Sequence, residues 1–304
     1  MELKTTLSGQ TVNNVVREVG INANYWYAIS GSKDVKLKRI LPVQLWEQVI
    51  LLFRDRQNCI QAVDNGGKMH SYPVQEKYGI IWVFPGNPVL AEHQSLPKIP
   101  EYDDPNYLKL CVSAHFNAHF SICNENAMDV FHGYRHQNLQ GWFDPALIKL
   151  RQTDDSVTAD YQVSYNNLIA KLLGSSNGKV TKKVMTVSFR YPHLVNRLED
   201  SSILYLMRVP VGKTESRSLS LLFLKSPVPQ WLSYILRPVL QPVIVHLLFL
   251  RSLKQDIEMI ESEQENYLKN PQRRYVEVNP AIHAMQRLTI RQYEQYLQSR
   301  KASV

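Results

Sequence analysis

Residues 123–136 of this 304-residue chain read Cys-Asn-Glu-Asn-Ala-Met-Asp-Val-Phe-His-Gly-Tyr-Arg-His. If this segment is helical, four polar side chains fall at i, i+4, i+7 and i+11 and share one face, namely Glu125, Asp129, His132 and His136. Two imidazoles one turn apart can bind the same cation, and a carboxylate on the same face can fix the tautomer of one ring. The segment therefore predicts half of a metal site.

The same spacing also has a purely structural interpretation. His132 and His136 can be histidines at the edge of the core that donate to backbone carbonyls, with Glu125 and Asp129 as their salt partners. His-x-x-x-His is a motif with frequent false positives. Spacing alone leaves both interpretations open.

Composition limits the class of protein. The net charge is +8, which favours acidic partners, but the basic residues are scattered and form no stripe interleaved with aromatic residues, so we expect no nucleic-acid binding. The three cysteines are far apart and form no Cys-x-x-Cys pair, which argues against a disulfide framework and a structural zinc site. With no secretory pattern at the N-terminus, we expect a cytoplasmic protein.

Short apolar runs separated by polar turns predict β structure in the first part of the chain, at residues 26–29, 48–53, 59–63 and 79–84. Later, residues 157–165 alternate as a half-buried strand does, and residues 203–211 and 217–225 flank a polar connection typical of a hairpin. A second His-x-x-x-His pair, His115 and His119, lies in an alternating segment, and we interpret it as the polar face of a strand.

Residues 230–250 are strongly apolar but are interrupted by Arg237, two prolines and His246. We favour a buried helix pair or pocket wall, keep peripheral contact with a lipid surface as the alternative, and favour a membrane span least. In the next segment Asp256 shares a helical face with Ile260, so it needs a cationic partner or a metal. An amphipathic helix is predicted over residues 280–297.

Four stretches, in this order, resemble the Rieske-type non-haem iron oxygenases, large (alpha) subunit: Asn24–Tyr27, Leu51–Val63, Glu125–His132 and Gln255–Glu261. The likeness favours the branch with pheophorbide and chlorophyllide oxygenases. It implies an α+β fold in which residues 1–95 form a truncated Rieske-like β domain without its cluster-binding insert. Residues 96–304 then form a helix-grip (START-like) antiparallel-sheet catalytic domain with C-terminal helices.

The resemblance also implies roles for single residues. His132, His136 and Asp256 match the ligands of a mononuclear Fe(II), and Asp129 matches the catalytic aspartate that links the iron to the cluster of a neighbouring subunit. The family separates its two histidines by four residues and this chain by three, so Gln137 occupies the family's second position. The substrate pocket is expected to include four side chains, Phe131, Tyr134, Trp231 and Leu248.

Members of the family bind a [2Fe-2S] cluster through Cys-x-His and Cys-x-x-His, and this chain contains neither motif. Val63-Asp64 runs directly into Asn65-Gly66-Gly67, and the residues that follow resemble the family's sequence just after the cluster. Cys59 and His70 remain nearby, but two ligands cannot hold a cluster that needs four. We expect no [2Fe-2S] cluster on this chain.

The implied activity is that of an oxidoreductase that hydroxylates or demethylates an apolar ring substrate with dioxygen. Its electrons would come from a ferredoxin-like donor, or from an intact homologue in a mixed oligomer, and the subunits would form a homo- or hetero-trimer. The alternative is a non-catalytic subunit that binds a hydrophobic ligand or regulates an active homologue, or a truncated inactive product.

Overall fold

The computed structural model describes residues 11–66, 70–136, 141–166, 180–226, 242, 245, 249–273 and 277–302. After helix α2 (Val12–Glu18), the chain forms two small antiparallel sheets with strand orders β1-β6-β5 and β2-β3-β4. Their strands are β1 (Tyr27–Gly31), β2 (Leu41–Leu45), β3 (Gln48–Arg54), β4 (Ile60–Asp64), β5 (Val74–Lys77) and β6 (Ile80–Val83). Short helical turns follow at α3 (Pro88–Ala91) and η2 (Pro100–Tyr102), and η1 (Ser32–Asp34) follows β1.

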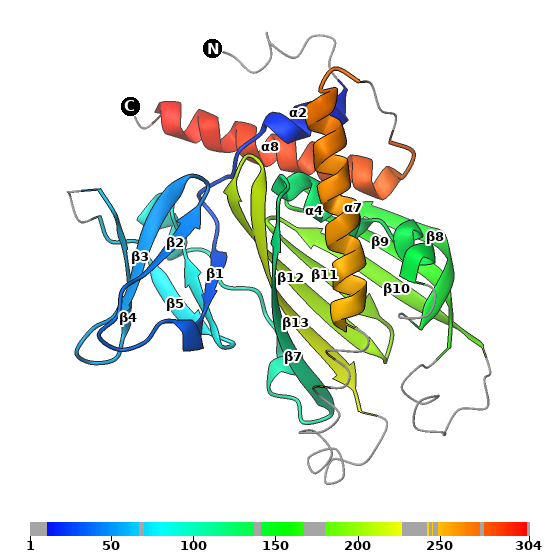
Figure 1. The fold of residues 1–304 in the computed structure, drawn as a ribbon, viewed down its shortest axis with the longest axis horizontal. Helices are drawn as coiled ribbons and strands as arrows, with labels where there is room; N and C mark the ends of the chain where they lie inside the picture. Colours follow the sequence, from blue (N-terminus) through cyan, green and yellow to red (C-terminus); the bar gives the residue numbers. More distant parts are fainter. Residues whose placement is uncertain are drawn as a thin grey trace.

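The second part of the chain builds one seven-stranded antiparallel sheet with the order β7-β13-β12-β11-β10-β9-β8. Its strands are β7 (Tyr107–Phe116), β8 (Trp142–Gln152), β9 (Ser156–Tyr165), β10 (Thr181–Arg190), β11 (His193–Leu198), β12 (Ser202–Gly212) and β13 (Glu215–Lys225). Between β7 and β8 lie α4 (Phe120–Met128) and the 3-10 helix η3 (Phe131–His136). Helix α7 (Leu250–Lys269) crosses one face of this sheet, while α8 (Pro280–Ala302) runs along one end beside α2 (Figure 1).

Apolar side chains from these helices and strands form continuous cores. Met285 and Leu288 of α8 are buried against Val187 and Phe189 of β10. Phe120 at the start of α4 packs with Tyr27 and Ile50 of the small sheets. Burying such side chains is the dominant favourable contribution to folding. The core therefore fixes α4 and its C-terminal continuation against both the small sheets and the large one.

The α+β class and its antiparallel sheets are confirmed. The predicted runs correspond to β1, β3, β4, β6 and β9, and residues 203–211 and 217–225 form the hairpin β12–β13. The C-terminal helix extends to Ala302, five residues further than predicted. The boundary between residues 1–95 and 96–304 stays a prediction.

The prediction for His119 is wrong. Strand β7 ends at Phe116, and His119 caps the N-terminus of α4, where its ring accepts the backbone N–H of Ser121. The ring is 1% exposed and also contacts the carbonyl of Val19. Burial lowers the pKa of His119 to about 3. It is a neutral core histidine, whereas His115 does lie on β7 and pairs with Glu215.

Two segments pair directly at the point where the cluster-binding insert is expected to be missing. The N–H of Asp64 donates to the carbonyl of His70 at 3.0 Å, and Tyr72 N–H donates to Ala62 at 2.9 Å. Val63 also forms an antiparallel bridge with Ser71. Residues 62–64 and 70–72 therefore lie side by side as neighbouring extended segments.

Within the described ranges, no helix is long and apolar enough to cross a membrane. Apart from Pro242, Val245, Phe249 and Leu250, the apolar segment 230–250 lies outside the described residues, and so do Trp231 and Leu248.

Candidate metal centre

The polar stripe of residues 125–136 is not one helix face, so that prediction is wrong. Helix α4 ends at Met128, and Asp129 has an extended backbone with φ −80° and ψ 104°. The Asp129 carboxylate accepts the N–H of Phe131 at 3.0 Å, a local bond of the kind that lets aspartate compete with helix continuation. The chain resumes as η3, which carries both histidines.

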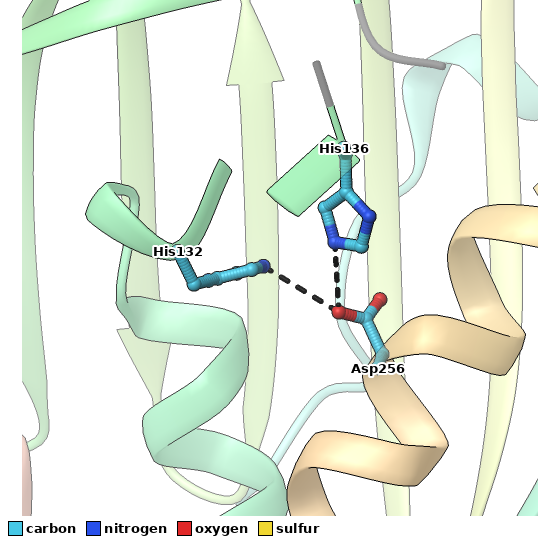
Figure 2. Close-up of side chains that lie close together, drawn as sticks. All are labelled: His132, His136 and Asp256. Atoms are coloured by element: carbon cyan, nitrogen blue, oxygen red, sulfur yellow. Dashed lines mark hydrogen bonds and ion pairs between the residues drawn. The ribbon is translucent and has the colours of Figure 1, made fainter. Parts of the chain in front are cut away.

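Two helices nevertheless bring three ligand atoms together. Asp256 Oδ1 on α7 lies 3.0 Å from His136 Nε2 and 3.5 Å from His132 Nε2 (Figure 2). One ligand atom from each residue lies within 4.8 Å of the others. Both rings point toward the carboxylate from η3, and the carboxylate points back from α7 (Figure 2). Among the described residues this is the single group of three such side chains.

The hydrogen bonds of His136 fit a cation at this point. Its Nδ1–H donates to Oε1 of Gln255 at 2.7 Å, which leaves the lone pair of Nε2 facing Asp256. Two electron-rich atoms at 3.0 Å need either a cation beside them or a second proton on the ring. The hydrogen bond to Asp256 accordingly raises the pKa of His136.

His132 has no competing partner within the described ranges. Its Nδ1 is buried without a hydrogen bond, and its Nε2 faces the shared carboxylate. Two imidazoles and one carboxylate on one side of a divalent ion form the donor set typical of non-haem iron(II) sites with open positions. The residues present therefore fit a divalent metal ion held by His132, His136 and Asp256.

Glu125 is not part of this group. Its carboxylate is paired with the buried guanidinium of Arg17 from α2, with Nη2 to Oε2 at 2.6 Å. Burial alone would lower the pKa of Arg17, but the charges and hydrogen bonds of Glu125 and Glu263 raise it well above its ordinary value. Gln286 also donates to Glu125 at 3.0 Å. The alternative in which Glu125 and Asp129 are the salt partners of the histidines is wrong.

Asp129 lies in the sequence between Glu125 and the two histidines. Its Oδ1 accepts Phe131 N–H and lies 3.4 Å from the amide of Asn279. It lines the same cavity as His132 and His136. Its predicted role, linking the metal to a redox centre on a neighbouring subunit, stays a prediction.

A cavity of about 250 Å³ opens onto the three ligands. Its apolar wall comes mainly from the seven-stranded sheet, with Trp142, Met185, Leu198, Leu204, Leu206 and Leu222. Phe131 and Tyr134 do not line it and are 42% and 53% exposed. The sequence predicts a continuous α-helix here, but residues 131–136 form a 3-10 helix. Side chains three residues apart in a 3-10 helix lie on the same side, so Phe131 and Tyr134 both face outward. Trp231, Leu248 and Gln137 lie outside the described residues.

Sequence reasoning missed two side chains at the site, Gln255 and Arg208. Gln255 precedes the carboxylate ligand, and no pattern marks a neutral amide as the partner of a distant histidine. Arg208 did carry a signal. Arg208 lies two residues after Leu206 and four after Leu204 in the alternating strand 203–211. Because every second side chain of a strand points to the same face, this spacing predicts that Arg208 faces the same side of the sheet as the two leucines.

Comparisons with known proteins agree with this architecture. No protein-family model matches the chain. It is 24% identical to a 4beta-methylsterol monooxygenase of Methylococcus capsulatus, in an alignment that covers 93% of this chain and 92% of that protein. It is 31% identical over 64 residues to the oxygenase component of dicamba O-demethylase of Stenotrophomonas maltophilia, which is 21% of this chain and 19% of that protein.

Solved structures share the fold at low sequence identity. Dicamba monooxygenase bound to 3,6-dichlorosalicylic acid matches with a TM-score of 0.72 and 16% identity, over 93% of this chain and 99% of that chain. The oxygenase of carbazole 1,9a-dioxygenase, in its reduced complex with ferredoxin, matches with a TM-score of 0.60 and 13% identity, over 94% and 92%. The chain therefore has the α+β fold of the Rieske-type oxygenases, with a candidate metal centre where η3 meets α7.

Proposed function

We propose that this protein is a mononuclear non-haem iron oxidoreductase that hydroxylates or demethylates an apolar ring substrate with dioxygen. The convergence of His132, His136 and Asp256 in the wall of a largely apolar cavity carries the proposal. When bound there, ferrous iron would supply the one-electron chemistry that activates dioxygen. A solved neighbour with this fold, dicamba monooxygenase, has been described with non-haem iron.

Each residue of the centre has a defined task. His132 and His136 offer neutral nitrogen donors, and Asp256 offers the carboxylate that compensates the charge of a divalent ion. Gln255 holds the His136 ring in the tautomer whose Nε2 is free to bind. The apolar side chains of β10 to β13 exclude water from the cavity and orient a hydrophobic ring. Asp129 is proposed to link the iron to the redox centre of the electron donor.

Monooxygenation consumes one dioxygen, two electrons and two protons, and one oxygen atom leaves as water. The proposed source of these electrons lies outside the chain, since the sequence contains neither Cys-x-His nor Cys-x-x-His. The tight pairing of residues 62–64 with 70–72 fits a missing insert. So does the sterol monooxygenase alignment, whose 340 positions exceed the whole length of this chain.

The proposed donor is a ferredoxin-like protein, or the cluster of an intact homologue in a hetero-trimer. The oxygenase of carbazole 1,9a-dioxygenase forms a complex with ferredoxin, and its fold is shared with this chain. The net charge of +8 suits an acidic ferredoxin, since opposite charges speed and orient association. A homo-trimer, the branch with pheophorbide and chlorophyllide oxygenases, cytoplasmic localisation and peripheral membrane contact stay predictions.

Metal analysis tests the proposal first. After anaerobic reconstitution with ferrous iron and gel filtration, we expect about one iron per chain and no acid-labile sulfide. His132→Ala and Asp256→Ala should each lower the iron content sharply, while His115→Ala, on the exposed pair with Glu215, should leave it unchanged. Wild-type protein that retains no iron would contradict the proposal.

Turnover separates catalysis from mere binding. The iron-loaded protein is mixed with reduced ferredoxin, isotopically labelled dioxygen and a 4β-methylsterol, because the sterol monooxygenase aligns with 93% of this chain. Label in a sterol product supports the oxygenase. Iron binding together with saturable sterol binding, but without labelled product from the sterol or from a ring compound that carries a carboxylate, would favour the alternative of a non-catalytic ligand-binding or regulatory subunit.

A further inference from the structure

A buried arginine lies in the wall of the cavity, and no carboxylate among the described residues forms an ion pair with it. Arg208 of β12 is 3% exposed and lines the same cavity as the three candidate ligands. Its Nε donates to Asn124 at 3.1 Å, its Nη2 donates to the carbonyl of Cys123 at 2.6 Å, and its guanidinium lies 5.1 Å from the centre of the Phe116 ring. Its Nη1 has no hydrogen-bond partner among the described residues. A buried charge without an ionic partner is costly, so this one needs an explanation.

The other charges in the cavity wall are engaged elsewhere. Asp129 accepts Phe131 N–H and contacts Asn279, and Asp256 faces the two imidazoles. Burial lowers the pKa of Arg208, and the charge of Asp256 opposes this only from outside ion-pair distance. A divalent ion at the candidate metal centre would balance the two carboxylates and leave Arg208 as the uncompensated charge.

The register of the sheet gives the cavity a polar end and an apolar end. On neighbouring strands β12 and β13, Arg208 pairs with Ser218, Leu206 with Ser220, and Leu204 with Leu222. Paired residues on adjacent strands share a face, and all six of these side chains line the cavity. The wall therefore changes within four residues from a guanidinium and hydroxyls to leucines.

From these observations we infer that the substrate is an amphipathic molecule with an apolar ring body and a carboxylate, and that Arg208 binds the carboxylate. This inference rests on the proposed function and names its substrate class. The Nη1 group of Arg208 donates to a carboxylate oxygen. The hydroxyls of Ser218 and Ser220 lie 3.2 Å apart and bond to each other, which leaves one O–H of the pair to donate at the same end. The leucines contact the ring. Arg208 is thus a specificity-determining residue that also ties the wall to α4.

Binding of a matched pair of ligands tests the inference, with 2-naphthoate and its uncharged analogue 2-naphthamide as probes. Protein loaded with redox-inert zinc should bind naphthoate about ten- to a hundredfold more tightly than naphthamide, the range expected for a charge-assisted hydrogen bond. R208Q should lose this factor for naphthoate and change naphthamide binding little. Calorimetry measures both affinities, and circular dichroism checks the fold.

R217Q is the matched control. Arg217 lies on β13 beside Val209 and lines a different cavity, so its replacement should leave the preference for naphthoate intact. If R208Q does not fold, R208K keeps the charge but lacks the guanidinium geometry and should show an intermediate loss. Wild-type protein that binds the two probes equally would overturn the inference without any variant.

Binding of the two probes to metal-free protein tests whether the carboxylate binds Arg208 or the metal. If zinc removal abolishes the preference and R208Q has no effect, the carboxylate was binding the metal, and the inference is overturned. Equal weakening of both probes by R208Q would show a purely structural role and would also overturn it. If zinc does not bind at all, the proposed function fails, and the same comparison on metal-free protein still decides the role of Arg208.

Discussion

The two polar clusters on either side of the C-terminal end of α4 are built from similar residue types but differ in how they are completed. Upstream, Glu125 accepts hydrogen bonds from Arg17 and Gln286, and Arg17 also donates to Glu263. Every charged group there contacts an opposite charge, and we call these four residues the closed cluster. Downstream, His132, His136 and Asp256 direct lone pairs toward one another, and we call these three residues the open cluster. The charges of the first cluster are compensated within the protein, although Gln286 Oε1 is buried without a hydrogen-bond partner, and those of the second cluster need a cation or extra protons.

This difference separates structural polar groups from functional ones. Both clusters arise from the same short segment, and residue type alone did not distinguish them. They differ in whether each carboxylate contacts a cationic side chain, as Glu125 contacts Arg17. The closed cluster should therefore govern the stability of the fold, and the open cluster should govern metal binding. The following changes are ordered from the largest expected effect to the smallest.

Arg17→Met should cause the largest loss of stability, about 3–5 kcal/mol in the free energy of unfolding, because it leaves the Glu125 charge buried and unpaired. Iron content per folded chain should stay near that of the wild type. Urea denaturation and metal analysis measure the two quantities. The double variant Arg17→Met with Glu125→Leu should recover most of the loss, and a double variant as unstable as the single one would contradict the closed-cluster account.

Metal loading should stabilise the wild type by about 2.7 kcal/mol when free metal is a hundredfold above its dissociation constant. Chelation should remove this gain. Asp256→Asn should abolish it while changing the stability of the metal-free protein by less than about 1 kcal/mol, since a partly exposed carboxylate contributes little there. A metal-dependent shift in Asp256→Asn equal to that of the wild type would show that the ion binds elsewhere.

Gln255→Leu should weaken metal binding about 10- to 100-fold without abolishing it, because His136 loses the partner that fixes its tautomer. Competition with a chelator of known affinity measures the change. Glu258→Gln, on the same helix and exposed, provides the control. Unchanged affinity in Gln255→Leu would remove Gln255 from the site.

Glu101 provides a second closed cluster with a smaller effect. Its burial raises its pKa, but hydrogen bonds from Tyr205 and Arg197 outweigh this and leave the pKa below the ordinary value. The folded state therefore gains stability from the carboxylate above pH 4.5 and loses it as the pH falls through the lower folded pKa. Stability measured at pH 7 and pH 4 should fall less in Glu101→Gln than in the wild type. An identical fall would contradict this assignment.

Sequence reasoning reached much of the fold because alternation and helical periodicity report burial directly. It identified the hairpin β12–β13 and the helix that ends the chain. It missed β2, β5, β8, β10 and β11 and most of β7, and exposed polar residues interrupt the pattern in strands such as the largely exposed β8. At the site it named His132, His136 and Asp256, which the structure brings together.

The errors have physical causes that lie outside local sequence. Helix α4 ends before Asp129, whose side chain accepts the Phe131 N–H, although the helical spacing of polar residues continues to His136. The partner of Glu125 comes from Arg17, 108 residues away, which no local spacing reveals. The same applies to Gln255, which contacts a histidine 119 residues away. Partners that are distant in the sequence decide whether a buried polar group is paired within the protein or left to bind a cation.

Anomalous diffraction from crystals soaked anaerobically with ferrous iron tests the central claim most directly. The account predicts one iron peak at bonding distance from His132 Nε2, His136 Nε2 and Asp256, and none beside Glu125 and Glu263. A peak in the Arg17–Glu125 cluster, or no peak at the triad in crystals that contain iron, would contradict it.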